Sequence, residues 1–516
     1  MNEIAIGVEA LTEQQVLDVA RHDARVRLSD EARKAISASR DVIETLAGDP
    51  EPHYGISTGF GALATKQIAP EDRAALQRSL IRSHAAGSGP EVEREVVRAL
   101  MLLRLSTLAT GRTGVRLETA EAYAAMLNAG ITPVVYEFGS LGCSGDLAPL
   151  AHCALAAMGE GTVRVNTGRV GGEALPAARA LAAAGLTPVV LREKEGLALT
   201  NGVDGMLGML TLATHDLALL FQTADLAAAM SVEAQLGTDA VFAADLQALR
   251  PHPGQADSAA NLRALLADSA IMASHRGPEC TRVQDAYSLR CSPQVHGAGR
   301  DTLTHARLVR DRELASAIDN PVVTLDDRVE SNGNFHGAPV GYVLDFLAIA
   351  AADLASIAER RTDRFLDRAR NHGLPAFLAD DPGVDSGYMI AQYTQAALVS
   401  ELKRLAVPAS VDSIPSSAMQ EDHVSMGWSA ARKLRRAVDA LTQVLAIEIL
   451  TAARALDLRA PLSPAPATAA ARDALRQRVA GPGPDRYLAP DIAATVELVR
   501  SGRLVAAAEA VCGPLR

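Results

Sequence analysis

Four long segments with few charged residues most constrain the fold of this chain. They cover residues 205–236, 340–364, 386–405 and 429–456, and alanine and leucine dominate them. Helices that are apolar around most of their circumference have to be buried by other helices. Aromatic residues make up only 3% of the chain, so the residues that favour sheets are scarce. We therefore predict a mainly α protein with an elongated central helical bundle.

Shorter patterns predict the elements around this bundle. Residues 12–46 begin with TEQQ, which has the spacing of a capping box, and are predicted to form one helix. Residues 70–85 and 92–128 have helical periodicity. Residues 54–61 and 461–484 are predicted loops because of their glycine or proline content. Residues 161–172 alternate as a hairpin does.

Composition narrows the class of protein. The net charge of −11 and the lack of a basic patch with interleaved aromatic residues argue against a nucleic-acid partner. The five cysteines form no CxxC pair, as in a reduced cytosolic protein, and the N-terminus lacks the apolar region of a signal peptide. We expect a cytoplasmic protein that does not bind membranes. We divide it into a mixed N-terminal region (1–195), the central bundle (196–460) and a C-terminal helical cap (461–516).

The sequence GSLGCSGDLAPLAH, residues 139–152, can support unusual backbone chemistry. If the amide nitrogen of Gly145 attacks the carbonyl carbon of Cys143, a five-membered ring forms and one water is lost. Loss of a second water from Ser144 leaves an exocyclic methylene. Glycine suits the third position because it has no Cβ to obstruct its nitrogen, and serine supplies a hydroxyl that can be eliminated. The alternative is an ordinary glycine-rich turn without modification.

This stretch resembles the signature of the aromatic amino acid ammonia-lyases, which carry a self-made methylidene-imidazolone group. Five separated blocks extend the resemblance from about residue 11 to DRYLAPDIAATVELVRSG near the C-terminus. The family usually has alanine where this chain has Cys143, a change that leaves the backbone chemistry intact. The resemblance implies a fumarase/aspartase-like lyase architecture, no external cofactor or metal, and a homotetramer whose active sites draw residues from three subunits.

The resemblance also implies roles for separated side chains. Besides Cys143, Ser144 and Gly145, it assigns to catalysis Tyr54 as the base in a mobile loop, Asn201, Tyr287, Phe335 and Glu421. It assigns to substrate binding His84, Gln284, Arg290, Met389 and Gln420. Simpler roles remain open, namely packing for Tyr54, helix capping for Asn201, and structural hydrogen bonding for His336.

Arg290 is the expected clamp for the substrate carboxylate, because a guanidinium binds a carboxylate through two parallel hydrogen bonds. The intervals of three and four residues predict one helical face that contains Gln284, Tyr287, either Arg290 or Cys291, and Gln294.

Ser83 and His84 indicate the substrate. In the family this pair lies at the substrate ring, and members that act on phenylalanine or tyrosine have leucine at the second position. The resemblance therefore implies that the ring is an imidazole, with His84 pairing with one nitrogen and Glu421 with the other; an unpaired buried nitrogen would cost about 1–3 kcal/mol. The expected reaction is L-histidine to trans-urocanate and ammonium, the first step of histidine degradation. A tyrosine or phenylalanine lyase, an aminomutase and an inactive binding homologue are the alternatives.

Overall fold

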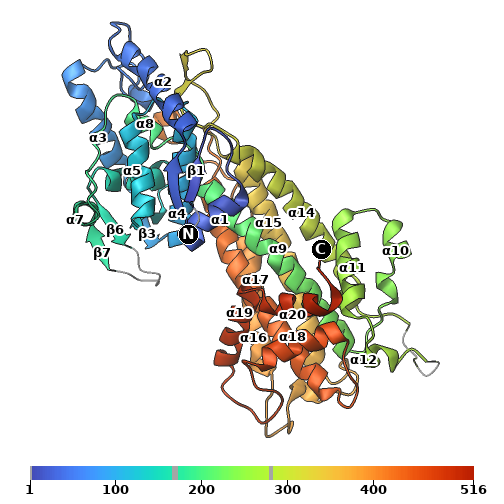
Figure 1. Ribbon diagram of the computed structural model, residues 1–516. Coiled ribbons are helices and arrows are strands. Elements are labelled where there is room, and N and C mark those ends of the chain that lie inside the picture. Colours follow the sequence, from blue (N-terminus) through green and yellow to red (C-terminus); the bar gives the residue numbers. More distant parts are fainter. Residues whose placement is uncertain (1–2, 166–172, 278–279, 281–282) are drawn as a thin grey trace. The chain divides into compact units, whose positions relative to one another are not determined.

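The computed structural model describes residues 3–165, 173–277, 280 and 283–516. Helices dominate these residues, and the predicted mainly α class is confirmed (Figure 1). The chain divides into two compact units. The first comprises 1–212, 307–345 and 408–432, and the second comprises 213–306, 346–407 and 433–516.

All four long apolar segments are helical. They form α9 (Asp204–Ala234), α15 (Ala338–Leu366), α16 (Met389–Leu405) and α17 (Gly427–Leu458). By length and composition α9 and α15 could each cross a membrane, but their most apolar stretches are 83% and 61% buried. Such burial is what the core helices of a bundle require.

Among its described residues, the first unit contains eight shorter α-helices and four small sheets. Its helices are α1 (Glu13–His22), α2 (Asp30–Ala47), α3 (Arg73–His84), α4 (Arg94–Ala109), α5 (Leu117–Asn128), α6 (Leu147–Ala157), α7 (Ala177–Ala183) and α8 (Glu195–Ala198). Its strands are β1 (Glu3–Ile6), β2 (Arg25–Leu28), β3 (Ser88–Glu91), β4 (Ile131–Pro133), β5 (Tyr136–Phe138), β6 (Thr162–Val165), β7 (Ala174–Pro176), β8 (Val322–Val323) and β9 (Val329–Glu330). Strands β1 and β2 pair in parallel, whereas β3–β5, β4–β6–β7 and β8–β9 pair antiparallel.

The second unit packs helices on helices. Helix α20 (Arg503–Cys512) contacts α18 (Pro466–Arg476), α19 (Ala489–Arg500) and α11 (Pro253–Leu265). The other helices that lie wholly in this unit are α10 (Ala244–Ala248), α12 (Ala270–Ala273), α13 (Tyr287–Arg290) and α16. Helix α14 (Ser292–Leu314) contributes residues to both units, as do α9, α15 and α17.

Two of the shorter predicted helices are interrupted. The capping box at Thr12 is confirmed, but α1 ends where Asp23 adopts a φ of +56°. The next residues alternate between exposed and buried positions and form β2. Residues 92–128 form α4 and α5, with a break at Gly114, where a φ of +71° and a Cβ position only 2.3 Å from Ile43 Cγ1 require glycine. Local periodicity alone did not reveal these breaks.

Two other expectations need revision. Residues 461–484 contain helix α18, because Pro466 occupies its first turn, where proline is favoured. The predicted hairpin at 161–172 is present as the antiparallel pair β6–β7, but its second strand begins at Ala174. Residues 166–172 lie outside the described residues.

The stability of the second unit should depend on a buried ion pair between α15 and α17. Glu448 Oε1 accepts from Arg361 Nε at 2.5 Å, and neither side chain is exposed to solvent. We predict that Glu448→Gln lowers the free energy of unfolding by about 3–5 kcal/mol, because it leaves a buried guanidinium without a countercharge.

Urea denaturation provides the measurement. The matched control is Glu401→Gln, which breaks an exposed pair with Arg404 and should change stability by less than about 0.5 kcal/mol. Equal effects of the two substitutions would contradict this account.

Candidate active site

The loop between β5 and α6 is held against a second loop by its backbone. Gly145 has a φ of +86°, and a Cβ on it would lie 2.2 Å from the Gly202 carbonyl oxygen. The two glycines form a β-bridge, and the amide of the next residue, Asp146, donates to the Gly202 oxygen at 2.7 Å. Only glycine permits this approach, so the backbone that follows Ser144 is fixed in place.

Asp146 connects this loop to the start of α9. Its Oδ2 accepts from the backbone amides of Gly205 and Met206, both at 2.9 Å, and its Oδ1 accepts from Ser140 Oγ at 2.9 Å. Burial raises the pKa of Asp146 to about 7, while these hydrogen bonds act in the opposite direction. Asp146, rather than Asn201, therefore satisfies free amides at the start of α9. Asp146 lies within residues 139–152, but the sequence did not predict this role for it.

Arg104, on α4, holds the loop that carries Asn201. Its side chain is fully buried. Nη1 donates to the carbonyls of Ala198 at 3.0 Å and Asn201 at 2.6 Å, and Nη2 donates to the carbonyl of Ile318 at 3.2 Å and lies 3.0 Å from a carboxylate oxygen of Asp204. One guanidinium thus joins two segments that are distant in sequence. Arg104 was not predicted from the sequence, although an arginine within the apolar run 99–105 of a predicted helix was a usable signal.

The amide of Asn201 is oriented by a neighbouring asparagine. Asn201 Nδ2 donates to the carbonyl of Asn320 at 3.1 Å, and Asn320 Oδ1 accepts from the amide of Asn332 at 3.0 Å. Beneath them Lys194 Nζ lies 2.5 Å from Asp319 Oδ2, with both side chains fully buried. Burial lowers the pKa of Lys194 and raises that of Asp319. These two residues were also missed by the sequence analysis.

Ser144 faces a carboxylate. Its Oγ donates to Glu421 Oε1 at 2.9 Å, and Glu421 Oε2 accepts from Ser416 Oγ at 2.7 Å. Burial, and next the charge of Glu421, raise the pKa of the Cys143 thiol to about 12, so the thiol is neutral. The structure therefore brings Cys143, Ser144 and Glu421 together.

His84, the last residue of α3, lies within range of the charge of Glu421. Burial lowers its pKa, while the Leu80 carbonyl and the Glu421 charge act in the opposite direction. Ser83 Oγ donates to the Leu80 carbonyl at 2.9 Å and lies 3.1 Å from His84 Nδ1. Since the only hydroxyl proton of Ser83 is used, His84 Nδ1–H is the donor in the second contact, and Nε2 remains an acceptor.

Tyr54 and Phe335 also belong to the first unit. The hydroxyl of Tyr54 accepts from the amide of Gly61 at 3.2 Å, within the predicted glycine-rich loop. Phe335 is half-buried, and two residues later the amide of Gly337 donates to the carbonyl of Gly142 at 3.2 Å. The ring of His336 stacks on that of His423 with centroids 5.7 Å apart, which suits its structural interpretation. Phe335 is thus on a segment that borders the Cys143 loop.

The remaining predicted residues have other surroundings. Gln420 is exposed in the first unit, and Gln284, Tyr287, Arg290 and Met389 belong to the second unit. The prediction of one continuous helical face is wrong, because Gln284 precedes α13 and Cys291, with φ −97° and ψ 13°, separates α13 from α14. The guanidinium of Arg290 lies 4.8 Å from the centre of the Tyr287 ring.

Known proteins are similar to this chain over most or all of its length. A model of the aromatic amino acid lyase family matches residues 11–477. The histidine ammonia-lyase of Streptomyces avermitilis is 66% identical, with both chains covered in full. Among solved structures, a tyrosine aminomutase from Streptomyces globisporus matches with a TM-score of 0.93 and 39% identity, again covering both chains in full. A histidine ammonia-lyase from Trypanosoma cruzi matches with a TM-score of 0.90 and 37% identity, covering 99% of this chain and 96% of that one.

Replacing Arg104 with lysine should destabilise the first unit. A single ammonium cannot reach three carbonyls and Asp204 together, so buried acceptors lose their donor. We predict that Arg104→Lys lowers the free energy of unfolding by about 2–4 kcal/mol, measured by urea denaturation.

Arg82→Lys serves as the control, since Arg82 pairs with Glu160 at the surface and should tolerate lysine within about 0.5–1 kcal/mol. If Arg104→Lys lowers the free energy of unfolding no more than Arg82→Lys does, Arg104 does not hold the loop that carries Asn201.

Proposed function

Because this chain belongs to the aromatic amino acid lyase family and is a carbon–nitrogen lyase, we propose that it converts L-histidine to trans-urocanate and ammonium. This reaction is the first step of histidine degradation. The observation that carries the proposal is the hydrogen bond from Ser144 to Glu421, whose charge also acts on half-buried His84. The 66% identity to a histidine ammonia-lyase over the full length supports the same substrate.

The residues of the loop fit a methylidene-imidazolone formed from Cys143, Ser144 and Gly145. Gly145 has no room for a Cβ beside Gly202, and the Ser144 hydroxyl, which ring formation would eliminate, already donates to Glu421. Cys143 retains a buried neutral thiol beside the carbonyl that would enter the ring. When formed, this group supplies a strong electrophile for the substrate, with no external cofactor.

Ammonia loss requires that two bonds break. The Cβ–H electron pair becomes the Cα–Cβ double bond, and the nitrogen leaves with the electron pair of the Cα–N bond. We assign Tyr54 as the base that takes the Cβ proton, because its hydroxyl is held in a glycine-rich loop by the Gly61 amide. Asn201 and Phe335 flank the substrate, and the Asn201 amide is already oriented by Asn320.

Recognition of the imidazole ring is assigned to the pair of His84 and Glu421. The pKa of His84 is lowered by burial, so its neutral form presents Nε2 as an acceptor. His84 pairs with one ring nitrogen and Glu421 with the other, and because both then accept, the bound ring carries a proton on each nitrogen. A site built to hydrogen-bond a ring discriminates strongly against rings that lack those groups.

The substrate carboxylate is assigned to Arg290, with Gln284, Tyr287, Met389 and Gln420 completing the binding surface. We propose that Gln284, Tyr287, Arg290 and Met389 act in a homotetramer, where they reach substrate held by another subunit, whereas Gln420 serves the site of its own subunit beside Glu421. The high exposure of Tyr287, at 71%, suits such a role. Apolar Ile349, Ile390 and Tyr393 are also exposed in the second unit and would be covered by neighbouring subunits. We place the enzyme in the cytoplasm, without a nucleic-acid or membrane partner.

An aminomutase is the nearest alternative. The tyrosine aminomutase structure has a similar fold, but its identity to this chain is 39%, against 66% for the histidine ammonia-lyase of Streptomyces avermitilis. The product distinguishes the two, because a lyase releases ammonium and a conjugated acrylate whereas a mutase retains the amine.

Ser144→Ala should abolish formation of the electrophile. We predict that the wild-type chain is lighter than its sequence mass by two waters, that the variant has its full sequence mass, and that urocanate formation falls at least about 1,000-fold. Intact-protein mass spectrometry and the appearance of urocanate give the two measurements. Exposed Ser501→Ala should retain both the mass loss and the activity. Substantial turnover by Ser144→Ala would refute the assignment.

His84→Leu should weaken the selection of histidine. Leaving one imidazole nitrogen unpaired costs about 1–3 kcal/mol, so kcat/KM for histidine should fall about 5- to 150-fold, while phenylalanine or tyrosine gains access. Exposed His22→Leu on α1 is the control and should leave the kinetics unchanged. If His84→Leu has wild-type histidine kinetics, the ring is recognised by other residues.

A further inference from the structure

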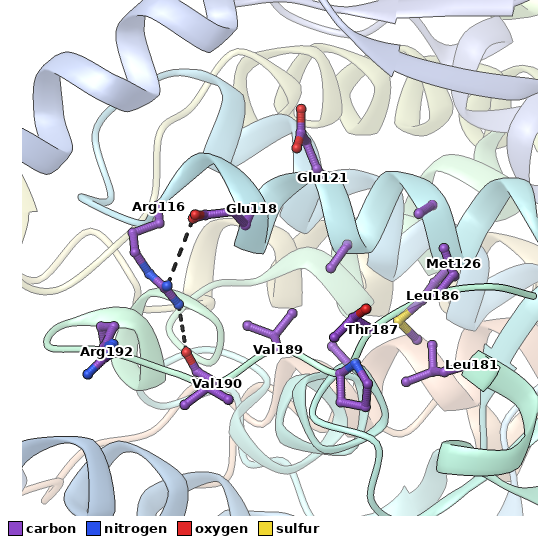
Figure 2. Close-up of a pocket in the computed structure, with 14 residues that line it drawn as sticks. Arg116, Glu118, Glu121, Met126, Leu181, Leu186, Thr187, Val189, Val190 and Arg192 are labelled. Carbon is purple, nitrogen blue, oxygen red and sulfur yellow. Dashed lines mark hydrogen bonds and ion pairs between the residues drawn. The ribbon is translucent and has the colours of Figure 1, made fainter.

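A pocket of about 410 Å³ lies in the first unit and shares no lining residue with the candidate active site. Helix α5 forms one wall and the segment 186–192 forms another (Figure 2), and α6 and α7 each contribute one lining residue. Its apolar part includes Ala125 and Met126 of α5 and Leu186 of the facing segment. The volume lies within the range of pockets that hold small molecules.

Charged side chains of both signs line the same pocket. Arg116 is committed to the protein, because it pairs with buried Glu195 at 2.9 Å and donates to the carbonyl of Val190 at 2.6 Å. Glu121 pairs with Arg33. These contacts, of which Figure 2 shows the one between Arg116 and Val190, satisfy one cation and one anion of the lining.

One cation and one anion remain available to a ligand. The side chain of Arg192 is exposed and has no partner among the described residues. The carboxylate of Glu118 is 72% exposed and its nearest cation, Arg116 Nη1, is 3.9 Å away. A ligand that carries only a carboxylate would meet the charge of Glu118, and one that carries only an amine would meet that of Arg192.

We propose that this pocket binds a free zwitterionic amino acid with an apolar side chain, at a site separate from the one that holds substrate. Arg192 pairs with the ligand carboxylate, for which a guanidinium is well suited, and Glu118 pairs with the ammonium. The side chain packs on Ala125, Met126 and Leu186. Such a ligand matches both the charges and the apolar surface of the pocket.

The wall of the pocket is connected to the loop that carries Asn201. The Arg192 amide donates to Glu195 Oε2 at 2.7 Å, and Glu195 also accepts from Arg116 and from Thr119 Oγ1 at 2.5 Å. Glu195 is the first residue of α8, which ends three residues before Asn201. A ligand that fixes Arg192 therefore restrains residues 187–201.

L-Leucine is the probe for this proposal, titrated into the full chain by calorimetry. We expect saturable binding, with 4-methylpentanoate and 3-methylbutylamine, which each lack one charge, binding at least about tenfold more weakly. Leucine should also slow hydrogen exchange in residues 187–201.

Two variants identify the site. Arg192→Gln removes the partner of the carboxylate, and Ala125→Trp fills the apolar part; each should weaken leucine binding at least about tenfold. Arg179→Gln, which removes an exposed arginine of α7 outside the pocket lining, should bind leucine as the wild type does. Basal histidine turnover should be unchanged in Arg192→Gln.

The proposal fails if leucine does not bind, or if its affinity is the same in Arg192→Gln as in Arg179→Gln. It also fails if 4-methylpentanoate or the amine binds as tightly as leucine. Binding that survives in Arg192→Gln would place leucine elsewhere, including the candidate active site.

Discussion

The buried guanidinium of Arg104 is the interaction on which the candidate active site depends. A charge removed from water is tolerated only where its hydrogen-bonding capacity is used. The two terminal nitrogens of Arg104 meet this condition by binding Asp204 and the carbonyls of Ala198, Asn201 and Ile318, whereas its Nε has no hydrogen-bond partner among the described residues. Residues 96–109 of α4 are all buried, so the helix offers this group a rigid base. The apolar core thus determines where the Asn201 loop lies.

The Cys143 loop is attached to the same framework through its backbone. Gly145 lies against Gly202, and Asp146 accepts from the first amides of α9. On another side, Ser425 Oγ donates to the carbonyl of Gly142 at 2.7 Å. Rigid supports of this kind are what a reactive group needs, since its orientation is set before substrate arrives.

The sequence predicted the long helices because their apolar character extends over many turns. It did not predict the break after α1 or the helix α18, which depend on one left-handed residue and on one proline at a permitted position. Within the site, Ser144 and Glu421 were found through a block resemblance and are in contact in the structure. Arg104, Asp146 and the pair of Lys194 and Asp319 were missed, because their importance comes from partners that no local pattern specifies.

The contact between Ser144 and Glu421 joins residues 277 positions apart. During synthesis, the serine leaves the ribosome long before its carboxylate partner has been translated. The arrangement around the serine hydroxyl is therefore a property of the completed first unit, and any chain that stops short of Glu421 carries the same tripeptide in an unassembled environment. The hydrogen bond of this serine therefore forms only after most of the first unit has been translated.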